Sequence, residues 1–102
     1  MFTADMWKIT VVKEKETSLE WVFAVTVLKG IQNDRIYYYD VVVEKEYYKQ
    51  LTRGVISPVS LVEHSFLFLL SKESPESILE SFNLKEISSH FSDYEEKMGK
   101  LQ

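Results

Sequence analysis

Two histidines, His64 and His90, come nearest in this chain to a metal-binding or catalytic pattern. Glu63 is adjacent to His64, and adjacent residues on a helix point about 100° apart, so the two side chains cannot bind one ion together. Asp93 follows His90 by three residues, but we expect the helix to end between them. The spacing predicts no metal site and no bound cofactor.

Hydroxyl groups stand beside both histidines, in the stretches His64-Ser65 and Ser88-Ser89-His90. Adjacency in sequence does not aim a side chain, and a serine nucleophile also needs an oxyanion hole, which no G-x-S-x-G turn supplies here. These serines are better explained as helix caps and polar-face residues. We therefore expect that the protein is not an enzyme. A hydrolase that uses His64 or His90 is kept as an alternative and ranks below the two functions described at the end of this section.

Composition removes several further classes of function. The chain has no cysteine and three glycines, Gly30, Gly54 and Gly99, so it has no thiolate site and no phosphate-binding glycine loop. Its net charge is −4 and its basic residues are scattered, which argues against nucleic-acid binding. The longest apolar run, Phe66–Leu70, is far shorter than the roughly 20 residues that span a bilayer. No signal peptide is visible, so we expect a cytoplasmic protein without membrane contact.

The first half of the chain has the period of strands. Apolar residues alternate with polar ones near its start, and two short charged or glycine-containing connections follow. The pattern predicts one strand that contains Trp7, Ile9 and Val11, one at Glu20–Leu28 and one at Arg35–Val43, with turns at Lys13–Ser18 and Lys29–Asp34. Such short connections indicate an antiparallel meander.

The second half has the start and stop signals of helices. Ser57-Pro58 and Ser74-Pro75 combine a capping serine with a proline suited to the first helical position, and Asn83 with Glu86 resembles a capping box. The expected helices are Lys45–Thr52 (ended near Gly54), Pro58–Ser71, a short one from Ser74 to Ser81, and one from Asn83 to about Phe91.

The fold class expected from these elements is α+β, a three-stranded antiparallel meander followed by three to four helices packed on one face. A chain of 102 residues with 45% hydrophobic residues is predicted to form one domain over residues 1–102. We expect residues 1–5 and 95–102 to fray at its ends.

The second and third strands are apolar on both faces. In an antiparallel sheet with one face exposed to solvent, apolar and polar residues should alternate more clearly. Aromatic residues with polar tips gather in the same half of the chain, and such residues are enriched at protein interfaces. The sequence therefore predicts a non-enzymatic interaction module that binds a protein partner or forms a homodimer. The predicted interface residues are Trp7, Trp21, Tyr37, Tyr38 and Tyr39.

The alternative is a pocket for a small apolar ligand between the sheet and the helices. Its predicted lining is Phe66, Phe68, Phe23 and Trp21.

The last part of the chain resembles a family of small uncharacterised prokaryotic proteins. The resemblance covers Ser65-Phe66-Leu67-Phe68-Leu69-Leu70, Pro75, Glu76-Ser77-Ile78-Leu79, and Phe82, Leu84, Ile87 and Phe91 through Tyr94. The chain departs from the family pattern at Lys72-Glu73-Ser74, His90 and Ser92. The resemblance implies a β-rich first half and a helical second half, and it assigns no activity and no catalytic residue.

Overall fold

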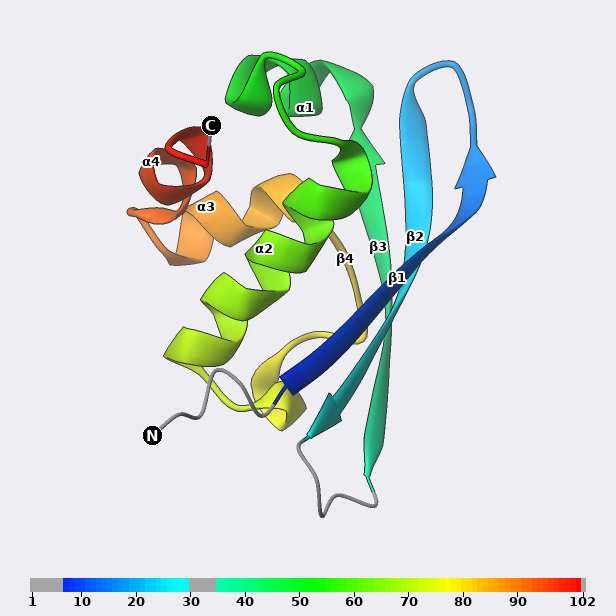
Figure 1. The fold of residues 1–102 in the computed structure, drawn as a ribbon, viewed down its shortest axis with the longest axis vertical. Coiled ribbons are helices and arrows are strands. Elements are labelled where there is room, and N and C mark those ends of the chain that lie inside the picture. The colour runs from blue at the N-terminus through cyan, green and yellow to red at the C-terminus, as the bar shows by residue number, and fades with distance from the viewer. Residues whose placement is uncertain (1–6, 30–34, 102) are drawn as a thin grey trace.

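A computed structural model describes residues 7–29 and 35–101, and over these residues the chain folds as an α+β structure. A sheet forms one layer and the helices lie together on one side of it (Figure 1). Among the residues described, no helix is both long and apolar enough to cross a bilayer. The α+β class is confirmed.

The three predicted strands form an antiparallel meander: β1 at Trp7–Glu16, β2 at Glu20–Lys29 and β3 at Ile36–Glu44. β1 continues through Glu16, into the stretch Lys13–Ser18 that was expected to be a turn. The turn is therefore shorter than predicted and lies between Glu16 and Glu20. A bulge between Lys13 and Lys15 keeps the strand paired with β2 there. The predicted turn at Lys29–Asp34 lies mostly outside the described residues.

The long helix α2, Pro58–Lys72, packs across the sheet (Figure 1). Ser57 caps it as predicted, its side chain accepting a hydrogen bond of 3.1 Å from the backbone N–H of Ser60. The preceding helix α1 spans Lys45–Thr52, the predicted bounds. It ends where Arg53 and Gly54 take positive φ values of 55° and 75°, the left-handed conformation that glycine favours after a helix.

The core lies between α2 and the face of the sheet toward it. Every second residue of β2 and β3 is buried there, together with the inner side of α2. The fully buried apolar residues of these three elements are Phe23, Val25, Val27, Val41, Val43, Leu61, Val62 and Phe66, each no more than 1% exposed.

The segment after α2 differs from the prediction of a helix from Ser74 to Ser81. Only a 3₁₀ turn forms, at Pro75–Ser77, and the chain then extends into a short strand, β4, at Ser81–Asn83. β4 pairs in parallel with β3, and the backbone N–H of Asp40 donates to the carbonyl of Glu80 at 2.8 Å. Over the described residues the sheet is thus mixed and four-stranded, because the outer edge of β3 has backbone groups that this segment satisfies.

After β4 the chain forms a 3₁₀ turn at Leu84–Glu86, the short helix α3 at Ile87–His90 and the helix α4 at Tyr94–Gly99. The Asn83 side chain caps the first of these, accepting from the N–H of Lys85 at 3.2 Å. The stretch 95–102, expected to fray, contains most of α4, which is helical through Gly99 and has Met98 buried in the core one turn after Tyr94. The other stretch expected to fray, 1–5, lies outside the described residues.

Candidate functional site

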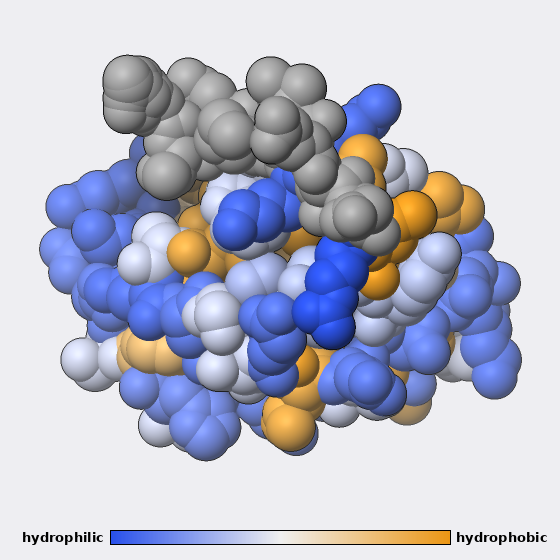
Figure 2. Space-filling model, turned by 90° about the horizontal axis from the view of Figure 1, so that it is seen from below, coloured by the Kyte–Doolittle hydropathy of each residue, from blue (hydrophilic) through white to orange (hydrophobic). Residues whose placement is uncertain are grey.

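The face of the sheet that points away from the helices has several apolar side chains that are exposed to solvent. Its residues are Lys8, Thr10 and Val12 on β1, Val22, Ala24, Thr26 and Leu28 on β2, and Ile36, Tyr38, Asp40 and Val42 on β3. Tyr38 is 68% exposed, Val12 56% and Ile36 48%. We call this set the open face. Viewed from below, hydrophobic residues reach the surface on the right, the side on which the sheet lies in Figure 1, as well as at the lower centre and left (Figure 2).

The five aromatic residues predicted to form an interface do not share a face. Only Tyr38 lies on the open face, paired with Thr26 of β2. Tyr39 is buried in the core, and Trp7, Trp21 and Tyr37 are partly buried against it from the helix side.

The hydroxyl groups of Tyr37 and Tyr39 hold the 3₁₀ turn against the sheet. Tyr39 donates a hydrogen bond of 2.8 Å to the carbonyl of Pro75, and Tyr37 donates one of 2.7 Å to the carboxylate of Glu76. Burial raises the pKa of Tyr39 to about 12, so its proton stays in place at neutral pH. These two tyrosines stabilise the fold in this structure.

Trp21 has a similar structural role at the other end of the sheet. Its ring meets Tyr48 of α1 edge to face, with centroids 5.4 Å apart, and the Lys45 ammonium lies 5.2 Å from its centroid. The same lysine pairs with Glu16 at 2.6 Å, and hydrogen bonds from Lys13 and Lys45 lower the pKa of that carboxyl to about 2.

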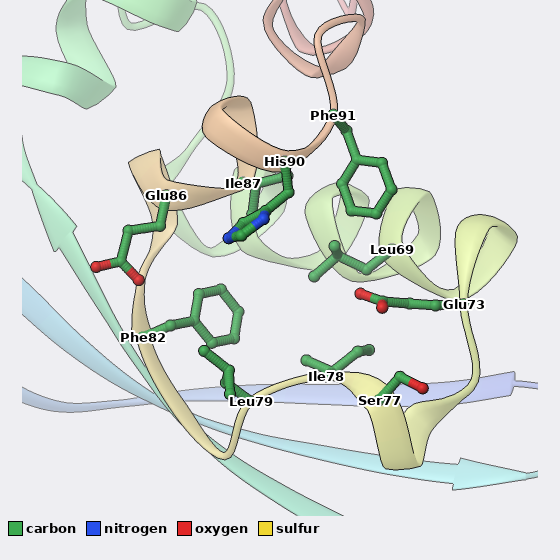
Figure 3. A pocket seen from close by; sticks show the side chains of 10 residues that line it. All are labelled: Leu69, Glu73, Ser77, Ile78, Leu79, Phe82, Glu86, Ile87, His90 and Phe91. Carbon is green, nitrogen blue, oxygen red and sulfur yellow. The ribbon is translucent and has the colours of Figure 1, made fainter.

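A pocket with a volume of about 490 Å³ lies on the helix side of the molecule. The end of α2, the extended segment before and within β4, and α3 surround it (Figure 3). It is lined by Leu69, Glu73, Ser77, Ile78, Leu79, Phe82, Glu86, Ile87, His90 and Phe91. Its volume falls in the range of small-molecule sites, roughly 300–1,000 Å³.

This pocket is not the one that the sequence predicted. Phe23 and Phe66 are closed into the core at 1% exposure or less, Phe68 is buried, and Trp21 packs on α1. The side chains expected to line a cavity fill the space between sheet and helices instead. The pocket forms where the chain runs from the end of α2 through β4 to α3, and no local pattern in the sequence predicts that these separate segments line one pocket.

The two histidines occupy unrelated positions. His64 Nδ1 lies 2.9 Å from the carbonyl of Ser60 one turn earlier in α2, so the ring donates to its own helix. His90 is exposed at the wall of the pocket. Within residues 7–29 and 35–101, no three His, Asp or Glu side chains gather in a way that could hold a metal ion.

The buried serine beside His64 also has a structural partner. Ser65 Oγ donates to the carbonyl of Leu61 at 2.7 Å and lies 2.7 Å from the hydroxyl of Tyr94. It faces the core, on a different side of α2 from the contact between His64 and Ser60, so His64 and Ser65 do not form a base and nucleophile pair.

Comparisons with models of protein families, with curated proteins and with solved structures gave no match. The resemblance to the prokaryotic family stays a prediction.

Proposed function

We propose that this protein is a non-enzymatic interaction module that forms a homodimer through the open face. The observation that carries the proposal is the exposure of Tyr38, Val12 and Ile36 on a face against which none of the described helices packs. Removing such apolar area from water contributes about 25 cal/mol per Å², which acts against the entropic cost of pairing two chains.

A second copy of the chain suits this face because its charges are self-complementary. Lys8 and Asp40 stand at opposite corners, two strands apart and separated by four positions along the strands. At about 4.8 Å between strands and about 3.3 Å per residue, their Cα atoms are about 16 Å apart. Neither side chain has an ion-pair partner among the described residues.

A two-fold axis in the interface, at right angles to the line from Lys8 to Asp40, brings each lysine to the partner's aspartate. The axis passes near Thr26, midway between the two corners. Val12 and Ile36 occupy the other two corners and lie close to the axis, so each meets its own copy in the partner. The strands of the two sheets then cross at a steep angle, the orthogonal class of sheet packing.

The test is light scattering coupled to size-exclusion chromatography at high micromolar concentration. We expect twice the mass of one chain for the wild type, and a shift toward the monomer for Tyr38→Asp, because a buried aromatic anchor contributes about 2 kcal/mol or more. Leu79→Asp is the matched control, since Leu79 is 64% exposed and lies away from the open face. It should leave the mass unchanged.

Charge exchange tests the arrangement of the two copies. Lys8→Glu and Asp40→Lys should each weaken association, and the double variant should restore it, because the exchanged pair again has opposite signs. A monomeric wild type refutes the proposal outright. A dimer that Tyr38→Asp leaves intact refutes the assignment of the open face.

Trp21→Lys does not probe this interface, although the sequence predicted Trp21 to belong to it. Trp21 packs against Tyr48 on the helix side of the sheet, so a charge there is expected to destabilise the fold.

A further inference from the structure

The pocket beside α3 has an apolar interior. Leu69, Ile78 and Ile87 are buried and form its inner wall, and Phe82 and Phe91 close it from two sides (Figure 3). Leu79 stands 64% exposed at its edge, so the pocket is open to water. Such a lining binds a hydrocarbon or ring of a small ligand and releases water in doing so.

Apart from His90, the ionisable residues of the lining are acidic. Glu73 and Glu86 contribute carboxylates, and no lysine or arginine is among the lining residues. Glu73 follows the last turn of α2, is half-buried, and extends its carboxylate into the pocket between Leu69 and Ile78 (Figure 3). Glu86 lies at the opposite end of the pocket.

Neither carboxylate forms an ion pair with another described residue. The ion pairs found over the described residues engage Glu16, Glu44, Glu76, Asp93 and Glu96, and they leave Glu73 and Glu86 without a Lys or Arg partner. A half-buried carboxylate between two apolar side chains loses hydration, and a bound cation restores favourable interactions to it.

We propose that this pocket binds a small amphipathic amine. The apolar body of the amine lies on Leu69, Ile78 and Ile87, and its ammonium group donates hydrogen bonds to the carboxylate of Glu73. Glu86 adds a negative potential at the other end. A fatty carboxylate of the same length would bring a second negative charge to Glu73, and a neutral alcohol would leave the charge of Glu73 unpaired. The pocket therefore selects ligands by the sign of the head-group charge and favours a positive one.

This site is separate from the open face, so its test is independent of dimer formation. The experiment titrates the full chain with n-octylamine, n-octanol and n-octanoate in turn, below the concentrations at which they aggregate. Binding is followed by NMR shifts of the methyl groups of Leu69, Ile78 and Ile87, which report on the pocket itself.

We expect saturable shifts with octylamine and an affinity about tenfold or more below it for octanoate, with octanol between them. Glu73→Gln should weaken octylamine binding about three- to tenfold and should not weaken octanol binding, because the variant removes the negative charge that pairs with the ammonium group and that the alcohol leaves unpaired. Glu80→Gln is the control: it removes the same charge from an exposed residue of the same segment that does not line the pocket. It should leave octylamine binding as in the wild type.

Three results would overturn the proposal. One is the absence of methyl shifts with octylamine at millimolar concentration. Another is equal affinity for the amine, the alcohol and the carboxylate, which would make the pocket an unselective apolar surface. The third is an unchanged affinity in Glu73→Gln, provided that the variant keeps the wild-type NMR spectrum outside the pocket.

Discussion

The hydrogen bond between Ser65 and Tyr94 connects α4 with α2. Removing one partner should lower the free energy of unfolding by a different amount from removing the other. Both side chains are fully buried. Burial raises the pKa of Tyr94, so its hydroxyl keeps the proton. Since Ser65 Oγ already donates to the carbonyl of Leu61, the Tyr94 hydroxyl is the donor in the 2.7 Å contact between them.

The magnitudes follow from what each substitution leaves behind. Tyr94→Phe removes one hydrogen bond and leaves Ser65 bonded to Leu61, which should cost about 1 kcal/mol. Ser65→Ala strands a buried tyrosine hydroxyl, which should cost about 1–3 kcal/mol, partly offset by about 0.5 kcal/mol of better helix propensity. The double variant has no stranded hydroxyl, so it should be about 1–2 kcal/mol more stable than the sum of the single effects predicts.

Urea unfolding of the wild type, the two single variants and the double variant measures this coupling. With an m value of about 1–3 kcal/mol per molar, a loss of about 2 kcal/mol moves the midpoint by about 1 M. Additive single effects would refute the hydrogen bond, because two side chains that do not interact have no coupling energy. A Tyr94→Phe variant less stable than Ser65→Ala would refute the assignment of donor and acceptor.

Three further changes should be visible in the same unfolding assay. Ser57→Ala should cost about 1 kcal/mol, because the N–H of Ser60 loses its cap; an unchanged midpoint would argue against the cap. Phe66→Ala should cost about 3–5 kcal/mol through the cavity that it leaves in the core, and a much smaller loss would mean that the core collapses around it. Burial raises the pKa of Tyr39 from 10.0 to about 12, so its contribution to the free energy of unfolding is present below about pH 10 and is lost as the pH rises toward 12, at about 1.4 kcal/mol per pH unit. Tyr39→Phe should flatten the alkaline limb of the stability profile, and an unaltered limb would contradict this.

The elements set by short-range signals could be predicted from the sequence. The bounds of α1 and the cap at Ser57 agree with the structure, because the residues that cause them are local. The Ser74-Pro75 start signal predicts a helix through Ser81, whereas the apolar spacing of four from Ile78 to Phe82 fits a strand as well as a helix. The free edge of β3 decides between them, and that edge is a property of the assembled sheet.

The placement of the aromatic residues shows a second limit. Successive residues of a strand point to opposite faces, so Tyr38 cannot share a face with Tyr37 and Tyr39. The alternation along this strand already separates Tyr38 from its two neighbours in the sequence, so residue type alone does not define an interface. The pocket, in contrast, is lined by residues of separate elements, among them Glu73 and Glu86. No local sequence pattern predicts that these two residues line the same pocket.

The parallel strand β4 also orders the events of folding. β1, β2 and β3 are neighbours along the chain, so their pairing closes short loops at little entropic cost. The partner of β3 on its other edge arrives only after the whole of α1 and α2. The contacts of Asp40 with Glu80 and of Tyr39 with Pro75 are therefore late, long-range contacts. We expect β3 to be an unprotected edge until they form, and a strand from another molecule could pair with the sheet at that stage.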